Sequence, residues 1–311
     1  MESVVNVVLP VFAIMAAGYA AGRLGILGPA SSQALNGFVF WCALPALFFG
    51  SMAQVETSEI FNVPYLIAYG GSALVTFALA LGIAVFAFPN RFGVLSMHAL
   101  SAIFSNTGYM GIPLLQIAFG AEGTLPGVIA TVLNGVVMIG IGIVLLETDR
   151  LGASWQLILR DALLGLAKSP LILSAVAGLA WSATGWGLAE PVITFTALLG
   201  GAAGPCALFA MGLFMVGKSF TAGLGEVGWV TFLKLLVMPA VAVWLAFDLL
   251  EMPRVWALSA VIMAALPTGA LMFVLAQEYE IYIQRSVAVI LITTVASVVT
   301  LSALFIWLGV G

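Results

Sequence analysis

Apolar stretches long enough to cross a lipid bilayer recur along this entire chain, and they decide what it can fold into. A helix needs about 20 apolar residues to span the hydrocarbon core. Such stretches follow one another with short polar loops between them; 63% of all residues are hydrophobic and 7% are charged. We therefore predict an all-α integral membrane protein with ten transmembrane helices, at residues 4–22, 32–53, 63–88, 94–117, 124–147, 163–183, 191–217, 228–250, 254–277 and 286–309.

The basic residues fall on one side of this predicted bundle. Eight of the nine lysines and arginines lie in the loops after odd-numbered helices or near that side, and Arg254 lies opposite. Since lysine and arginine are enriched in cytoplasmic loops, we expect a multi-pass protein of the bacterial-type cytoplasmic (inner) membrane with both termini outside. The longest polar stretch, 147–168, then separates five helices from five and faces the cytoplasm.

The division into five and five has a topological consequence. The second half enters the membrane from the opposite face, so a duplicated chain consists of two inverted five-helix repeats, here 1–149 and 150–311. Residues 42–52 (CALPALFFGSM) and 204–215 (GPCALFAMGLFM) show weak internal similarity of the kind a duplication leaves. Many secondary carriers are built from inverted repeats.

The predicted fourth and ninth helices are each interrupted near their middle. The interruptions are SNTGYMGIPLL at 105–115 and AALPTGALMF at 264–273. Lipid cannot hydrogen-bond the backbone groups that such a break frees, so a break persists only inside protein or beside a water-filled cavity. Matching breaks in two halves of a chain are typical of transporter binding sites. We expect unwound backbone near 108–111 and 267–269, with the two segments crossing near the midplane.

The interrupted segments carry groups that can bind an anion. A helix that begins within the membrane offers free amides and a partial positive charge, an asparagine amide can donate hydrogen bonds to a carboxylate, and glycine lets a ligand approach the backbone. The predicted substrate-binding residues are Asn36, Asn106, Thr107, Gly108, Gly111, Pro113, Pro267, Thr268 and Gly269. The alternative is that the prolines kink helices and that the asparagines join neighbouring helices.

Lys234 lies inside the predicted eighth helix. We favour the interpretation that its long side chain carries the ammonium group to the cytoplasmic interface. The alternative is a counter-ion for an anionic substrate, because charges within the membrane are functional by default. A coupling ion, H⁺ or Na⁺, is not identified, since no carboxylate lies firmly in the middle of the predicted membrane region.

Other functional classes have little support in the sequence. No basic patch is present for nucleic acid, no phosphate-binding loop for ATP and no nucleophile paired with a base for an enzyme. We therefore expect neither catalysis nor a cofactor. The single histidine, His98, has no evident metal-ligand partners, and we expect it to be a hydrogen-bonded polar residue at a helix start.

Four segments resemble the auxin efflux carrier family, whose bacterial members are often described as carriers of malonate and other organic acids. Residues 105–115 and 264–280 (AALPTGALMFVLAQEYE) are similar to the signatures of its fourth and ninth helices. Residues 35–49 (LNGFVFWCALPALFF) and 234–245 (KLLVMPAVAVWL) are similar to its second and eighth helices. The resemblance extends over the whole chain.

This resemblance implies inverted repeats with crossed broken helices, a scaffold of helices 1, 2, 6 and 7, and a mobile core of helices 3–5 and 8–10. It places Asn106, Pro113 and Pro267 at motif positions of the crossover, and it implies a homodimer. Small-residue stretches at 16–22 (AAGYAAG) and 200–204 (GGAAG) permit close helix contact, either between two copies or within one subunit.

The expected function is a secondary carrier that moves a small organic anion by alternating access, in an elevator mechanism. The anion is expected to be a carboxylate such as malonate or an auxin-like acid. Residues 63–88 carry no acid or lysine, whereas the plant hormone carriers resemble one another in having charge in their third helix. The alternatives are a non-transporting membrane receptor for such a ligand, a channel, and a sodium-coupled carrier similar to the bile-acid symporters.

Overall fold

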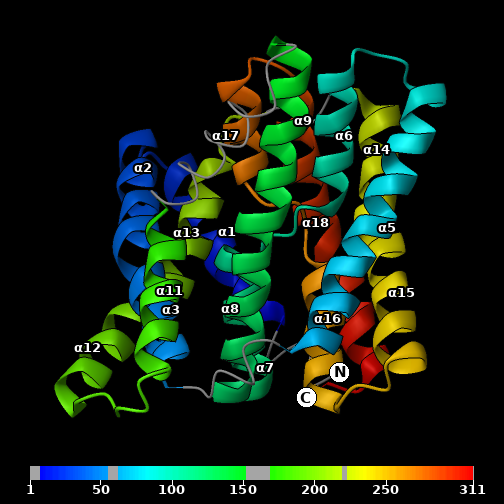
Figure 1. Cartoon of the computed structure of the whole chain (residues 1–311). Helices are drawn as coiled ribbons and strands as arrows, with labels where there is room; N and C mark the ends of the chain where they lie inside the picture. Colours follow the sequence, from blue (N-terminus) through cyan, green and yellow to red (C-terminus); the bar gives the residue numbers. More distant parts are fainter. Residues whose placement is uncertain (1–7, 55–61, 152–168, 219–222, 311) are drawn as a thin grey trace.

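The computed structural model describes residues 8–54, 62–151, 169–218 and 223–310, and every named element within them is a helix (Figure 1). The first half contains α1 (Leu9–Arg23), α2 (Pro29–Phe38), η2 (Val39–Ala43), α3 (Leu44–Ala53), α5 (Val63–Ala87), α6 (Phe92–Ile103), η3 (Thr107–Gly111), α7 (Ile112–Phe119), η4 (Gly120–Gly123), α8 (Thr124–Leu133), η5 (Asn134–Met138) and α9 (Ile139–Leu151). The second contains α11 (Pro170–Ser182), α12 (Glu190–Gly201), α13 (Ala203–Phe214), α14 (Leu224–Phe232), η6 (Leu233–Val237), α15 (Met238–Val243), η7 (Trp244–Leu249), α16 (Arg254–Ala265), α17 (Leu271–Glu278) and α18 (Ile283–Leu308).

Several helical stretches are long and apolar enough to cross a membrane, by length and composition. Within the described residues there are six of sufficient length and apolarity: Pro29–Ala53, Val63–Ala87, Thr107–Leu133, Glu190–Phe214, Leu224–Leu249 and Ile283–Leu308. Shorter apolar helices are α1, α6, α11 and α16. The helices coincide with the predicted apolar segments, and the prediction of an all-α integral membrane protein is confirmed. Ten crossings and the inverted-repeat arrangement stay predictions.

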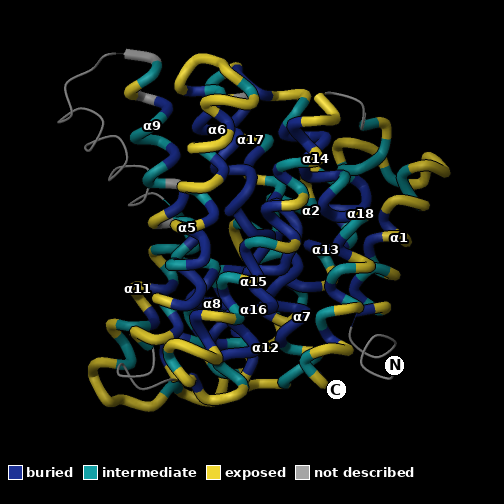
Figure 2. Tube along the Cα trace, turned by 90° about the vertical axis from the view of Figure 1, so that its right-hand side faces the viewer, coloured by how far each residue is buried: buried dark blue, intermediate teal, exposed yellow. Residues whose placement is uncertain are grey.

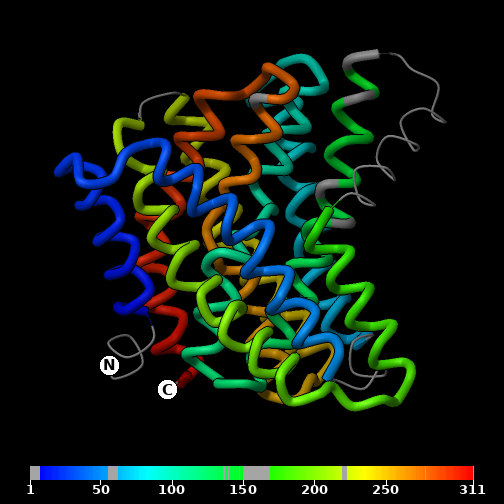
Figure 3. Tube along the Cα trace, turned by 90° about the vertical axis from the view of Figure 1, so that its left-hand side faces the viewer, coloured from blue at the N-terminus to red at the C-terminus, as the bar shows by residue number. Residues whose placement is uncertain are grey.

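The outer surface of the bundle is apolar, as a lipid environment requires. Phe86 on α5, Leu198 on α12 and Val299 on α18 are each more than two-thirds exposed. Buried residues occupy the centre of the bundle, as Figure 2 shows. The start of α1 and the end of α18 lie at the same end of the molecule (Figure 3). The chain is a multi-pass membrane protein whose polar groups are gathered inside.

The helices pack in two groups. In the first group, α1 packs on α13, α2 packs on α13, and α3 packs on α11 and α12. In the second group, α5 packs on α6, α15 and α16, α6 packs on α9, and α18 packs on α14 and α17. Figure 1 shows the first group to the left of the second. The groups meet where η3 and α7 contact α13 and where α8 contacts α3.

Small residues bring helices of the first group into direct backbone contact. A side chain at Gly18 of α1 would collide with the carbonyl oxygen of Phe209, and one at Gly212 of α13 would collide with that of Met15. Gly200 faces Leu47 in the same way. The small-residue stretches therefore serve contacts within one subunit, which was one of the two predicted alternatives.

Three π-helical segments precede a proline at the second position of the following helix. They are η2 before Pro45, η3 before Pro113 and η6 before Pro239. Proline has no N–H to donate, and its ring clashes with the carbonyl four residues earlier. A wider π turn relieves this clash and lets the helix continue. These prolines reshape helices without ending them.

Candidate functional site

Two chain breaks meet in the interior of the molecule. One separates α6, which ends at Ile103, from η3, which begins at Thr107; the other separates α16, which ends at Ala265, from α17, which begins at Leu271. The first break is therefore at 104–106. Our prediction of unwinding at 108–111 was wrong, because those residues lie within the π turn that accommodates Pro113. The second break includes the predicted residues 267–269.

An antiparallel backbone bridge joins the two breaks. Ser105 pairs with Thr268. The amide of Asn106 donates to the carbonyl of Pro267 at 2.9 Å, and the amide of Gly269 donates to the carbonyl of Phe104 at 2.9 Å. Each break thus supplies hydrogen-bond partners for backbone N–H and C=O groups that lack helical partners in the other break. This pairing removes the cost of unsatisfied backbone groups in a region without water.

Side chains from neighbouring helices hold the bridge in place. Asn134 of η5 donates its amide hydrogens to the carbonyl of Ser105 at 2.9 Å and to the hydroxyl oxygen of Thr107 at 3.2 Å. The hydroxyl group of Tyr69 donates to the side-chain oxygen of Asn134 at 2.8 Å. Asn134 is therefore fixed by three hydrogen bonds and orients the first break.

The side chain of Asn106 is placed differently. Only 7% of the residue is exposed, and its backbone carbonyl accepts from the amides of Met110 and Gly111. Its side-chain amide does not cap η3, and it makes no hydrogen bond to another described residue. Asn106 therefore has donors and an acceptor free for a ligand.

A cavity of about 1070 Å³ reaches the bridge from between the two helix groups. One wall comes from α2, η2 and the end of α13, and the other from the two breaks and η5. Aromatic rings line much of it: Phe40, Trp41, Phe104, Tyr109, Phe214 and Phe273. Polar side chains line the rest: Ser32, Gln33, Asn36, Ser105, Asn106, Thr107, Thr131, Asn134 and Lys218.

Lys218 is the one charged side chain among the described residues that line this cavity. Its ammonium nitrogen lies 5.2 Å from the ring centre of Phe214 and 5.0 Å from that of Phe273. These rings belong to α13 and α17, so the ammonium group sits between the two helix groups. Sequence reasoning counted Lys218 as a loop charge. Its position directly after the seventh predicted helix was the available signal.

The predicted site residues separate into two sets. Asn36, Asn106, Thr107, Gly108 and Gly269 line the cavity.

The other predicted residues build the break from behind. A side chain at Gly111 would meet Met263 at 2.5 Å, and the ring of Pro113 lies against Gly204. The carbonyl of Pro267 is used in the bridge. The hydroxyl group of Thr268 donates to the carbonyl of Ser101 at 2.8 Å.

Lys234 does not extend to the interface, and that prediction was wrong. Its side chain is fully buried. The ammonium group donates to the carbonyl of Ala264 at 2.6 Å and lies 3.3 Å from the sulfur of Met238. Ala264 belongs to the last turn of α16, where carbonyls lose their helical partners. A cation there also complements the negative end of the helix dipole. Lys234 caps the broken helix, outside the cavity lining.

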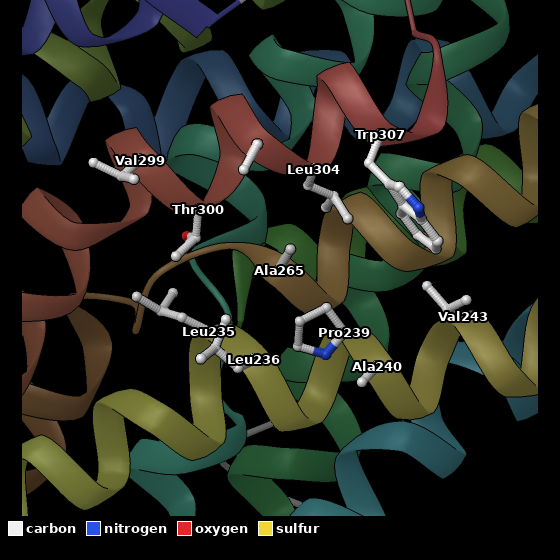
Figure 4. A pocket seen from close by; sticks show the side chains of 11 residues that line it. Leu235, Leu236, Pro239, Ala240, Val243, Ala265, Val299, Thr300, Leu304 and Trp307 are labelled. Carbon is white, nitrogen blue, oxygen red and sulfur yellow. The ribbon is translucent and has the colours of Figure 1, made fainter.

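A second hollow lies between α15 and α18 on the outer surface (Figure 4). Its volume is about 480 Å³, and its lining includes Pro239, Ala265, Leu304 and Trp307. The polar side-chain atoms among its described lining residues are the buried hydroxyl oxygen of Thr300 and the indole nitrogen of Trp307. The other described side chains that line this groove are apolar.

Comparison with known proteins gives one consistent result over nearly the full length. A family model described as "Membrane transport protein" matches residues 3–305. The chain is 31% identical to a Rhizobium meliloti protein named "Putative malonate transporter", over 98% of this chain and 95% of the relative. It is 26% identical to the "Uncharacterized transporter YfdV" of Escherichia coli, over 94% and 93%. A partial match, 31% identical over 38% of this chain and 14% of the relative, is to the "Lysosomal cholesterol signaling protein" of Mus musculus.

Proposed function

The chain belongs to the membrane transport protein family, that of the auxin efflux carriers, and from this membership we propose that it is a secondary carrier of a small organic anion. The anion is a carboxylate, such as malonate or an auxin-like acid. The observation that carries the proposal is the cavity between the two helix groups, which ends at the unpartnered amide of Asn106 and contains Lys218.

The cavity lining suits a carboxylate with an apolar body. The amide of Asn106 and the hydroxyl group of Thr107 are hydrogen-bond donors. Both lie at the start of the helix formed by η3 and α7, where the helix dipole favours negative charge. Lys218 supplies the positive charge, and the aromatic rings supply apolar surface. The carboxylate group of such a ligand is matched by the hydrogen-bond donors and the lysine, and its apolar body by the aromatic rings.

The arrangement of the two groups supports alternating access. The proposed scaffold is the first helix group, α1, α2, α3, α11, α12 and α13, and the proposed mobile core contains the two breaks. Lys218 and the aromatic rings of η2 belong to the scaffold side, whereas Asn106 belongs to the core. Sliding of the core against the scaffold, an elevator motion, would expose the site to each side in turn.

The wider assembly follows from the same proposal. The breaks at 104–106 and 266–270 are the crossed broken helices of two inverted repeats, 1–149 and 150–311. The carrier resides in the cytoplasmic membrane with both termini outside and functions as a homodimer. H⁺ or Na⁺ is the candidate coupling ion.

A second candidate function is a membrane sensor for the same ligand class. It is favoured by the partial similarity to a protein named for signaling. Both functions use the cavity, and they differ in whether bound ligand crosses the membrane.

Reconstitution into liposomes tests the proposal. Vesicles loaded with unlabelled malonate, or with an indole carboxylate, should accumulate the same labelled acid by exchange, and protein-free vesicles should not. Thermal-shift measurements on the purified protein identify which acids bind, since a bound ligand stabilises the native state. Binding of an acid without exchange across the vesicle membrane would refute the carrier function and favour the sensor function. Absence of both for a broad set of carboxylates would refute the proposed substrate class.

A further inference from the structure

A buried ionisable cluster lies in the second helix group, away from the cavity. His98 of α6 is fully buried, and its Nδ1 lies 2.9 Å from one carboxylate oxygen of Glu226 on α14. The other oxygen of Glu226 lies 2.8 Å from a guanidinium nitrogen of Arg285 on α18. α14 contacts both α6 and α18, and α18 also contacts α6; α6 and α14 lie at the upper right in Figure 1. Three helices thus contribute one group each.

The hydrogen bonds determine the proton positions in this cluster. A carboxylate accepts, so Nδ1 of His98 carries a hydrogen and donates it to Glu226. In the neutral ring the other nitrogen, Nε2, then keeps its lone pair. Nε2 is buried and has no hydrogen-bond partner in the part of the chain that the structure describes. One glutamate and one arginine balance each other while His98 is neutral.

The surroundings of the cluster offer no other compensating charge among the described residues. Tyr282 precedes α18; burial, and then the negative charge of Glu226, raise the pKa of its phenol well above the usual value, so it stays neutral. Directly after α5, the ring of Phe88 lies 5.7 Å from the imidazole ring of His98. From α9, Asp149 lies 3.9 Å from Arg91, and Glu278 of α17 is exposed.

Arg285 is the most exposed member of the cluster. Its side chain is 38% exposed, whereas that of Glu226 is 8% exposed and that of His98 is fully buried. The guanidinium group lies beside Gly223, where a Cβ atom would come within 3.2 Å of it, and over the ring of Tyr282. Glu226 in the interior needs one positive charge nearby. If Arg285 turns out into water, protonation of His98 supplies that charge.

Resting on the proposed function, we infer that His98, Glu226 and Arg285 form the site at which the carrier binds a coupling proton. Proton binding adds H⁺ to the lone pair of Nε2 and converts the imidazole to imidazolium. Arg285 and the proton are alternative partners of Glu226. His98 lies on α6, one turn before Ser101, whose carbonyl accepts from the hydroxyl group of Thr268 in the second break. Proton binding is thus linked through α6 to the region that forms the substrate site.

The sequence permits a direct test, because His98 is the only histidine. Purified protein with a tag that contains no histidine, labelled with ¹³C on the imidazole ring, gives one ring signal in a detergent micelle. If the cluster binds a proton, this signal changes over the measured pH range. Arg285→Gln removes a competing positive charge and Glu226→Gln removes the carboxylate, so both variants should alter the pH response of the signal, in opposite directions.

Arg91→Gln is the matched control. Arg91 directly precedes α6, its side chain is exposed, and its ion-pair partner is Asp149 instead of Glu226. It should leave the pH response of the ring signal as it is in the wild type. Should Glu226→Gln fail to fold, the comparison of Arg285→Gln with Arg91→Gln still decides. A ring signal that is constant over the whole range, or one that Arg285→Gln does not move, would overturn the inference.

A transport measurement completes the test. An imposed pH gradient should accelerate uptake of the labelled acid by the wild type and by Arg91→Gln, and His98→Gln should abolish this acceleration. The titration requires no substrate, so the two failures are distinguishable. Transport with a constant ring signal refutes the proton site, and a titrating ring without transport of any acid refutes the proposed function.

Discussion

Asn106 is the residue on which the proposed substrate contact depends most directly. Its side-chain amide reaches the cavity and has no hydrogen-bond partner among the described residues. Asn106→Ala should therefore weaken carboxylate binding about ten- to hundredfold, the value of a charge-assisted hydrogen bond of about 1.5–3 kcal/mol. Ligand titration by thermal shift measures this. Asn90→Ala, at an exposed loop asparagine, should leave affinity unchanged. Equal affinity in both variants would return Asn106 to a structural role.

Lys218 should act through its charge. Lys218→Met removes the cation from the cavity lining and should weaken anion binding about tenfold, whereas Lys218→Arg should retain most of it. The wild-type affinity should also fall with ionic strength more steeply than that of Lys218→Met, since the site is open to water. Isothermal titration at two salt concentrations checks both statements. An unchanged affinity in Lys218→Met would exclude this lysine from anion recognition.

Lys234 should affect the stability of the protein and not its affinity for the ligand. Lys234→Met leaves the carbonyl of Ala264 without its donor, at a cost of about 1–3 kcal/mol in stability. The melting temperature should fall by several degrees, while the affinity of the folded protein for its ligand stays within about twofold. Comparison with Lys218→Met on the same preparation separates the two lysines. A stable Lys234→Met protein with lost binding would restore the counter-ion hypothesis.

For single residues, the sequence indicated which side chains are chemically unusual in an apolar helix, but not which groups they contact. Asn106 was predicted because it lies in an interrupted apolar helix and its amide can hydrogen-bond a carboxylate, with helix joining as the alternative. The snorkelling of Lys234 was inferred from its depth along a helix, which says nothing about which face it occupies. Its partner, the carbonyl of Ala264, is supplied by another helix. Lys218 was missed because a lysine after a helix resembles any cytoplasmic charge.

Among the elements, α13 and α7 touch across the boundary between the helix groups. A Cβ atom at Gly204 would lie 2.9 Å from the ring of Pro113, whereas one at Gly201 meets nothing within 4 Å. Gly204→Val should therefore disfavour the arrangement seen here, with overpacking of about 1–3 kcal/mol. Exchange activity should fall strongly in Gly204→Val and stay near wild type in Gly201→Val. Equal activity in both would show that this contact does not constrain the carrier.

Glycine and proline identified the interrupted helices but not the position of each interruption. Proline at 113 suggested unwinding just before it, yet the chain widens there into a π turn and breaks earlier, at 104–106. The reason is that the break is positioned by its partner. Phe104 and Asn106 exchange backbone hydrogen bonds with Gly269 and Pro267, and no local preference encodes that pairing.

For the whole molecule, the distribution of basic residues predicts the orientation in the membrane. Single cysteines, placed in a variant that lacks Cys42 and Cys206, should react with an impermeant maleimide from outside at position 186 and not at position 90. Position 186 lies in the exposed loop between α11 and α12, and position 90 in the loop between α5 and α6. Labelling after membrane permeabilisation controls for reactivity. The reverse pattern would invert the proposed topology.

The grouping of helices could not be derived from apolar runs, because each run is compatible with many neighbours. Family resemblance predicted which helices form a scaffold. In the structure α1 packs on α13 and α3 packs on α11, and the division into scaffold and mobile core stays a prediction. The cavity could not be predicted from single helices either, because its walls come from both helix groups. Its walls come from residues between 22 and 274, so it exists only in the assembled bundle.

The backbone bridge also has a consequence for how the protein is made. Ser105 and Thr268 are separated by about half of the chain. The carbonyl of Phe104 is therefore synthesised well before the amide of Gly269, which donates a hydrogen bond to it in the folded protein. At ordinary rates of synthesis the delay is on the order of ten seconds. During that time the first break is without the partner strand that satisfies its backbone in the finished protein. An insertion chaperone or retained water has to shelter it, and a chain truncated before the second break should be a substrate for membrane proteases.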